Sequence, residues 1–458
     1  MPQLQDLLSE KKFTLLIECL THLPQQHQIP STLAGFPCCL TLADRVHSDH
    51  DPAPIEVAAQ YPQQEKVLHF AGKGKDIQDL EQFLDTAQSK GLKNLLLLTG
   101  DKLKQHDFDA NTRTRYLESV NAVMAAKARA YFCIGVAFNP FKYRRAEQDA
   151  QYFKLHKKLQ VGADYLITQL GYDLNKLREL KDFLQQHHYQ HPIFACVMPL
   201  TLGRAKFMRK AKVAGIVITD HMLDVLEQEK QLGLTDYAER RAALQILICQ
   251  HLGFAGVHLS SCHNRSAQQA LAAYIEEYRT LSLEQCEQLW HELWQIKTGQ
   301  EFVPHYAWHE EKLSVAAKMK YQQLHVMHAA VFASKLAKRV GRVIFNAKVW
   351  DKKAAGRGLI KAEFISKHRV VGCESCGQCR LADTLYVCPE TCPKGLANGP
   401  CGGTEGDRCE FGDRECIHSV KARLANEMGQ SFVLKHKLIP TVPIEVRGSS
   451  SWKNWYLS

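Results

Sequence analysis

The chain has 458 residues, a formal net charge of +10 and 45% hydrophobic residues. That length allows two to four domains, or one large barrel with an appendage. The ordinary apolar fraction permits large packed cores and excludes global disorder. No apolar run reaches the length of a membrane span, and the polar N-terminus MPQLQDLLSEKK lacks the apolar region of a secretory signal. We therefore expect a cytoplasmic protein that does not insert into membranes.

The first 265 residues alternate short apolar runs with helical stretches. The apolar runs are Leu-rich or β-branched, as strands covered on both faces should be. Eight such runs lie at 13–20, 38–43, 66–70, 94–98, 130–138, 164–170, 192–198 and 256–260. Helical periodicity occurs between them at 76–90, 110–126, 146–161, 174–187 and 235–252. This alternation predicts an α/β fold of the (β/α)8 TIM-barrel type, with a doubly wound open sheet as the alternative.

In such a barrel, catalytic side chains lie at the C-terminal ends of the strands. This rule selects Glu18, Thr41, His69, Thr99, Asp101, Phe138, Asn139, Gln169, Met198 and residues 260–265. Glu18 interrupts an apolar strand at its exit, which suits it to act as an acid, although an ordinary strand-end ion pair is the alternative. Gly100 and Asp101 form a tight turn that aims a carboxylate over the barrel mouth. Gln169 ends a strand with an amide that both donates and accepts, as heterocycle recognition requires.

The segment 266–372 is predicted to be mostly helical. Its basic residues are concentrated between Lys335 and Arg369, a pattern that indicates a solvated basic face or a docking surface for an acidic protein. No zinc-finger, RNA-recognition or helix-turn-helix signature accompanies it, so nucleic-acid binding is not expected. Near the C-terminus, Trp452, Trp455 and Tyr456 predict that the tail packs against the rest of the chain.

Cysteines provide the strongest compositional signal. Eight of the 16 cysteines are crowded into one short segment, and a reducing cytosol favours a metal site over disulfides there. The candidate metal ligands are Cys373, Cys376, Cys379, Cys388, Cys392, Cys401, Cys409 and Cys416. The spacing Cys-x2-Cys-x2-Cys is typical of [4Fe-4S] binding, and Cys388 and Cys392 each precede a proline. Zinc held by four cysteines is the main competitor, and eight cysteines could hold two centres.

Four segments of the first half resemble, in order, the methylenetetrahydrofolate reductase family. They are LLIECL around Glu18, LLLLTGD ending at Asp101, KLHKKLQVGADYLITQLGYD around Gln169, and HLSSCHNR ending at Asn264 and Arg265. The cysteine segment, with CESCGQC and CPETCPKGLANGPCGG, resembles the cysteine-rich C-terminal domain of the non-flavin partner subunit of acetogen-type reductases. Together the two resemblances cover most of the chain.

The resemblance implies a flavin-dependent oxidoreductase that interconverts 5,10-methylene- and 5-methyltetrahydrofolate. Glu18 would be the general acid and Asp101 would lie near the pterin and flavin, while Gln169, Asn264 and Arg265 would bind the reduced folate. The flavin, FAD in preference to FMN, would contact Thr41, His69, Phe138, Lys154, Lys157 and Lys158. The alternative is a non-catalytic folate- or methyl-handling partner or electron-transfer subunit. A methyltransferase accessory protein on the same fold is a third reading.

These observations predict three parts. Residues 1–290 form the barrel, 291–372 a helical connector with the basic stretch, and 373–458 a cysteine-rich metal or iron–sulfur domain with its tail. The resemblance also places Gly203 where enterobacterial members have an aromatic residue that grips a folded nicotinamide. An acidic carrier protein that docks on the basic stretch is therefore one expected electron donor, and NADH is the other. The sequence leaves the oligomeric state open.

Overall fold

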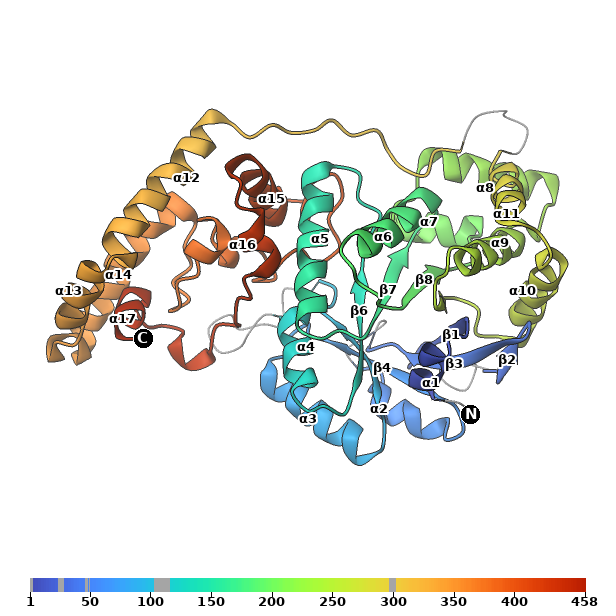
Figure 1. Cartoon of the computed structure of the whole chain (residues 1–458), viewed down its shortest axis with the longest axis horizontal. Coiled ribbons are helices and arrows are strands. Elements are labelled where there is room, and N and C mark those ends of the chain that lie inside the picture. Colours follow the sequence, from blue (N-terminus) through green and yellow to red (C-terminus); the bar gives the residue numbers. More distant parts are fainter. Residues whose placement is uncertain (1–2, 24–28, 46–47, 49, 103–115, 296–301) are drawn as a thin grey trace.

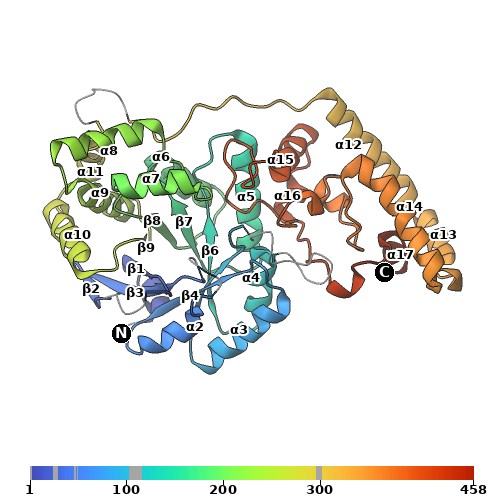
Figure 2. The same ribbon diagram turned by 180° about the vertical axis from the view of Figure 1, so that it is seen from behind.

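The computed structural model describes residues 3–23, 29–45, 48, 50–102, 116–295 and 302–458. A barrel lies at one end and a group of long helices at the other, with the cysteine-rich region between them (Figures 1 and 2). An extended segment that follows residue 301 crosses from the barrel to the first long helix (Figure 1). The barrel and the cysteine-rich region are therefore in contact, although the long helices lie between them in the sequence.

Eight parallel strands form the barrel: β1 Thr14–Cys19, β3 Phe36–Leu42, β4 Lys66–Ala71, β5 Asn94–Leu98, β6 Cys133–Phe138, β7 Tyr165–Leu170, β8 Ile193–Val197 and β9 Gly256–Leu259. Each strand pairs with the next along the chain, and β1 pairs with both β3 and β9, which closes the ring. A short strand, β2 Thr32–Leu33, runs antiparallel to β3. The predicted (β/α)8 barrel is confirmed, and the open-sheet alternative is wrong because the two edges pair.

Helices surround this ring. They are α2 Pro54–Val57, α3 Ile77–Ser89, α4 Ser119–Lys127, α5 Arg145–Gln160, α6 Leu174–Gln186, α7 Leu202–Ala211, α8 Asp220–Leu232, α9 Tyr237–His251, α10 Arg265–Tyr278 and α11 Leu283–Glu292. Hydrophobic periodicity predicted four of them closely, whereas α7 and α8 were not predicted. The helix expected at 110–126 begins at Ser119, and its first predicted residues lie outside the described part of the chain.

The N-terminal end of the barrel is closed by α1 Leu4–Ser9. Leu4 and Leu7 of this helix are buried against barrel residues that include Leu16, Tyr165 and Phe194. Because side chains alternate along a strand, Leu16 inside the barrel places Glu18 on the same, inward face of β1. The barrel interior is therefore closed at its N-terminal end, and the polar groups lie at the C-terminal ends of the strands.

The helical arm comprises α12 Val315–His328, α13 Lys335–Phe345 and α14 Lys353–Val371, with a π-helical turn at Ala329–Ala333 after α12. The last helix, α17 Ser451–Leu457, returns to this arm and packs on α13. The Tyr456 hydroxyl donates to the Val331 carbonyl over 2.7 Å, and the Trp455 indole donates to Phe332 over 3.2 Å. The prediction that the tail packs against the chain is confirmed.

The cysteine-rich region docks on the barrel through α5. Two of its helices, α15 Ile417–Met428 and α16 Ser431–His436, pack against α5, and Ala150 and Phe153 of α5 share one apolar cluster with Ala425 and Leu434. Residues all around α5 are consequently buried, which is unusual for an outer barrel helix. The lysines of α5 are thus part of an interface rather than a solvated surface.

Candidate functional site

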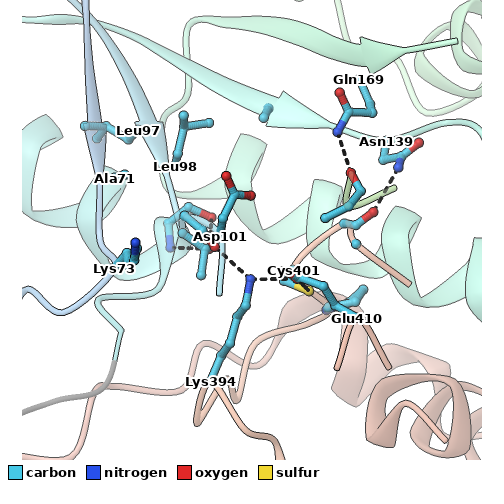
Figure 3. A pocket seen from close by; sticks show the side chains of 18 of the residues that line it. Ala71, Lys73, Leu97, Leu98, Asp101, Asn139, Gln169, Lys394, Cys401 and Glu410 are labelled. Atoms are coloured by element: carbon cyan, nitrogen blue, oxygen red, sulfur yellow. Dashed lines mark hydrogen bonds and ion pairs between the residues drawn. The ribbon is translucent and has the colours of Figure 1, made fainter. Parts of the chain in front are cut away.

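A cavity of about 470 Å³ opens at the C-terminal ends of the barrel strands. Its barrel side is formed by strand ends and the loops that follow them, including His69, Thr99, Asp101 and Gln169. Its other side comes from the cysteine-rich region, which contributes Lys394, Pro400, Cys401, Gly402, Gly403 and Glu410 (Figure 3). The volume suits a small-molecule ligand. Two regions far apart in sequence therefore build one pocket.

The predicted site residues divide into two sets. Those that line the cavity are His69, Asp101, Phe138, Lys154, Lys158 and Gln169. Those that do not line it are Glu18, Thr41, Lys157, Asn264 and Arg265. The structure thus brings together residues of four strand ends and helix α5, and it leaves the predicted acid outside the lining.

Glu18 is half-buried on the inward face of β1, near the buried polar side chains of Thr41 and His258. It lies close enough to His258 and Cys196 to influence their pKa values, although burial is the larger effect at both. Thr41 Oγ1 lies 3.1 Å from His258 Nε2. The rings of His258 and His69 have centroids 6.1 Å apart, and His69 reaches the cavity. Glu18 and Thr41 are therefore connected to the cavity through the two histidines.

Two buried nitrogen atoms in the cavity wall lack hydrogen-bond partners among the described residues: His69 Nε2 and Gln151 Nε2. Buried polar atoms in folded proteins are nearly always paired, so both nitrogens are available to a ligand. Burial and the neighbouring His258 lower the pKa of His69 to about 3, which keeps its imidazole neutral. Gln151 was not predicted as a site residue. It could have been found from its position on α5, because Lys154 and Lys158 follow it at i+3 and i+7 on the same helix face.

Asp101 follows the predicted tight turn. Gly100 has φ +91°, and a Cβ at this position would lie 2.8 Å from the Lys73 Cβ. The Gly100 carbonyl accepts a 2.7 Å hydrogen bond from Lys394 Nζ, which reaches it from the cysteine-rich region (Figure 3). The turn is therefore held in place by a side chain that sequence reasoning did not select.

Lys394 is the centre of a buried ionic group at the mouth. Its ammonium lies 2.7 Å from Glu410 Oε2, and the Cys401 thiol donates to the same oxygen over 3.1 Å. Burial disfavours the charged form of Lys394, but Cys401 and Glu410 outweigh this effect and raise its pKa. The cysteine-rich region therefore presents a buried Lys394–Glu410 ion pair to the cavity.

The three predicted flavin-phosphate lysines of α5 contact protein groups. Lys154 Nζ donates to the Gly399 and Pro400 carbonyls over 3.2 and 3.0 Å and pairs with Glu118 at 3.0 Å. Lys157 donates to Asn398 Oδ1 at 3.4 Å, and Lys158 to the carbonyl of residue 137 at 2.5 Å. Burial lowers the pKa of Lys157 and of Lys158 to about 7. Their role toward a flavin phosphate stays a prediction.

Gln169 also helps to hold the cavity wall. Its Nε2 donates to the Ala214 carbonyl over 3.1 Å, and its Oε1 accepts from the Leu170 amide over 2.9 Å. Beside it, Asn139 Nδ2 lies 2.9 Å from the carbonyls of both Gly215 and Gly402 (Figure 3). Each end of the Gln169 amide retains one further hydrogen-bonding position. The residue can therefore contact a ligand without releasing the wall.

The predicted pair Asn264 and Arg265 lies at the start of α10. Asn264 is the N-cap of this helix, and its Oδ1 accepts from the Ala267 amide over 2.8 Å. Arg265 is exposed. A capping role accounts for Asn264 on structural grounds, and a folate contact by either residue stays a prediction.

The eight clustered cysteines fall into two groups of four. Cys373, Cys376, Cys379 and Cys388 line one small cavity together with Lys367. Cys392, Cys401, Cys409 and Cys416 are electrostatic neighbours of one another, and Cys401 also lines the barrel cavity. Within the described residues, no three His, Cys, Asp or Glu side chains converge closely enough to hold one metal ion. The predicted metal site is therefore not confirmed by the arrangement of these side chains.

Comparison with known protein families identifies the barrel. The family described as methylenetetrahydrofolate reductase matches residues 43–274, which is half of the chain. The chain belongs to the methylenetetrahydrofolate reductase family. A second family, described as methylene-tetrahydrofolate reductase C terminal, matches residues 354–444 and so covers α14 and the cysteine-rich region. Both parts of the cavity wall thus fall within matched segments.

The individual relatives that match are only about one-quarter identical to this chain. Methylenetetrahydrofolate reductase 1 of Schizosaccharomyces pombe is 26% identical over 234 residues, which are 50% of this chain and 38% of that protein. A probable methylenetetrahydrofolate reductase (NADPH) of Caenorhabditis elegans is 26% identical over 197 residues, 40% of this chain and 29% of its own. The match therefore spans less than half the length of these curated relatives. A solved 2,3-dimethylmalate lyase covers 65% of this chain and 94% of its own at 12% identity, with a TM-score of 0.32.

None of the helices in the described ranges is both long and apolar enough to cross a membrane.

Proposed function

We propose that this family member is an oxidoreductase that binds a reduced folate at the barrel mouth and interconverts 5,10-methylene- and 5-methyltetrahydrofolate. The observation that carries the proposal is the cavity itself, in which Asp101, Gln169 and the unpaired nitrogens of His69 and Gln151 meet within the family-matched barrel. Asp101 and Gln169 offer acceptors and a donor to a pterin, and the nitrogens of His69 and Gln151 are left for the ring of a cofactor.

The charge of the cavity agrees with a folate. Arg45 and Lys102 are exposed residues that line the cavity and can face the carboxylates of a glutamate tail. Asp101 follows β5 and Gln169 lies near the end of β7, on either side of β6, where they suit the N–H groups and the carbonyl of the pterin. The folate would thus lie with its ring over the strand ends and its tail toward the basic rim.

The acid proposed for ring opening is Glu18. The reaction requires a proton on a nitrogen of the imidazolidine ring before the carbon–nitrogen bond opens. Glu18 is half-buried inside the barrel and influences His258, whose ring lies 6.1 Å from the ring of the cavity residue His69. A substrate ring that enters the barrel interior past His69 would approach it.

A flavin is the cofactor that the family implies, and the residues present fit part of it. His69 Nε2 and Gln151 Nε2 are unpaired donors or acceptors suited to an isoalloxazine ring and its ribityl chain, with Phe138 and Thr99 in the same wall. When bound, a flavin would supply the hydride for the methylene carbon. A phosphate at Lys154 or Lys157 would have to displace residues 398–400. We therefore propose that His69 and Gln151 hold the ring portion of the flavin, which is FAD in preference to FMN.

The contacts of Lys154 and Lys157 favour a second candidate, a folate-handling subunit without bound flavin. Flavin absorbance of the purified protein distinguishes the two candidates. A yellow protein with a flavin spectrum supports the reductase, whereas a colourless one that still binds folate supports the subunit. In the reductase, an acidic carrier protein would supply the electrons, because Gly203 is exposed and offers no aromatic ring to a nicotinamide. Direct reduction by NADH is the alternative.

Replacing Gln169 with alanine is expected to weaken binding of 5-methyltetrahydrofolate by about tenfold, because a buried ligand group loses its hydrogen bonds. Isothermal titration calorimetry measures this change. Gln148, which lies on α5 away from the cavity lining, provides the matched Gln→Ala control and should leave the affinity unchanged. Absence of folate binding by the unaltered chain, or an unchanged affinity in Gln169→Ala, would contradict the folate site.

We also propose that each group of four cysteines holds a metal centre, iron–sulfur or zinc. Four thiols around one cavity are a suitable donor set for either. Changing Cys376 and Cys379 to serine is expected to remove about half of the bound metal, and changing Cys401 and Cys409 the other half. Anaerobic metal and sulfide analysis with an electronic spectrum measures both. Loss of all metal in either pair alone would indicate a single site instead.

A further inference from the structure

The helical arm, residues 315–371, carries most of the exposed apolar surface. Of the 20 large hydrophobic side chains that are exposed in the described part of the chain, 13 lie on this arm. On α13, Leu336, Val340 and Val343 form a stripe at helical spacing and are 72%, 47% and 74% exposed. Apolar exposure concentrated in this way marks an interaction surface.

The same arm carries most of the net charge. Between residues 335 and 369 there are 11 Lys and Arg against two Asp and Glu, which gives +9 of the chain's +10. Both acids are paired: Glu363 is buried against Lys367, and Asp351 lies 2.8 Å from Lys453. The remainder of the chain is consequently near neutral. The arm is thus a strongly basic surface with apolar side chains interspersed.

An apolar groove of about 350 Å³ lies between the arm, the cysteine-rich region and α17. Its lining includes Met327, Phe332, Val370, Tyr386, Trp452 and Trp455. Aromatic residues and methionine are the types enriched at the centres of protein interfaces. Met327 and Val370, which line the groove, are also among the exposed side chains of the arm, so the groove opens onto the arm's exposed apolar surface.

The charge distribution selects the class of partner. Two arms would repel each other, and the near-neutral remainder of the chain has little net charge to attract the arm of a second copy. A nucleic acid would satisfy the charge but leave the 13 apolar side chains against a polar backbone. A bilayer surface is broad and cannot fill a concave groove between helices. A protein with acidic residues around protruding apolar side chains matches both features.

We infer that the arm is the docking site for a different protein, whose apolar side chains enter the groove while its Asp and Glu side chains face residues 335–369. Cys379 lines both this groove and the small cavity of the first cysteine group, so the partner would lie directly beside that group. The inference rests on the arm alone and does not depend on the folate assignment.

The test compares two full-length variants. Leu336→Asp with Val343→Asp places charge on the stripe, and Phe207→Asp is the matched control because Phe207 is 67% exposed on α7 of the barrel. Tagged proteins capture binders from an extract of the source organism, and quantitative mass spectrometry selects those lost at least tenfold only in the arm variant. Each selected protein is then purified and titrated against the unaltered chain, with crosslinks mapped by mass spectrometry.

The expected result is a purified partner that crosslinks to residues 315–371 and whose affinity falls as salt screens the surface charges, over a Debye length of about 8–10 Å at physiological ionic strength. The arm variant should lose this affinity and Phe207→Asp should keep it. The inference is overturned if no protein is lost selectively or if the crosslinks map elsewhere. It is also overturned if the arm variant instead loses binding to phosphatidylglycerol vesicles or RNA, or loses self-association in sedimentation.

Discussion

Replacing Glu18 with glutamine is expected to reduce folate turnover by about 100-fold or more. Glutamine keeps the shape of the side chain but cannot deliver a proton to the imidazolidine nitrogen. Binding of 5-methyltetrahydrofolate should change little, because Glu18 does not line the cavity. Steady-state turnover and calorimetric affinity, measured on the same preparation, separate a loss of proton transfer from a loss of binding.

A surface substitution controls for the loss of a carboxylate elsewhere in the chain. Glu10→Gln is the matched control, because Glu10 is a surface residue paired with Lys12 and should leave turnover unchanged. Near-normal turnover in Glu18→Gln would exclude the acid role.

The second large effect is expected at Glu118, a buried polar link between the barrel and the cysteine-rich region. Its carboxylate accepts hydrogen bonds from the Ala397 and Asn398 amides and pairs with Lys154, and it is 5% exposed. Breaking a buried pair of this kind costs about 3–5 kcal/mol, because a charge is left without its partner. Glu118→Gln should therefore lower the free energy of unfolding by roughly that amount.

Urea unfolding, together with limited proteolysis of the cysteine-rich region, measures this loss. Glu81→Gln is the matched control: Glu81 pairs with Arg129 at the surface, where such a pair contributes about 0–1 kcal/mol. A change in Glu118→Gln no larger than that in Glu81→Gln would show that other contacts hold the two regions together.

Acid should weaken the same link. Burial opposes ionisation of Glu118, but Lys154 and the Asn398 amide outweigh it, so the pKa of Glu118 lies below its ordinary value of 4.5. A carboxyl whose pKa is lower in the folded state contributes stability above the unfolded pKa and loses it as pH falls through the folded pKa. Between neutral pH and about pH 5 this contribution should be constant, and it should decline only below pH 4.5.

The barrel could be predicted from sequence because strands covered on both faces leave a direct pattern. The run 94–98 is Asn followed by four leucines, and β5 has those bounds. Asp101 and Gln169 could be placed at the mouth for the same reason, since parallel strands of a barrel end at one edge. The turn at Gly100 followed from residue type, because its φ of +91° favours glycine.

The long-range arrangement could not be predicted in this way. Lys154, Lys157 and Lys158 have the pattern of a solvated helix face, yet residues 397–400 cover them, and nothing local encodes that contact. Lys394 and Glu410 enter the barrel cavity for the same reason, from a segment nearly 300 residues beyond Gly100.

The division of labour between sequence and tertiary structure follows from the range of the interactions. Hydrophobic periodicity, turn residues and cysteine spacing are local, and by themselves they determined the barrel, its polar strand ends and the crowding of eight cysteines. Only the tertiary structure decided that these cysteines form two groups of four, that one group borders the barrel cavity, and that the basic arm is left uncovered. Those outcomes depend on the packing of α5 against α15 and α16, which sums many weak contacts between distant segments.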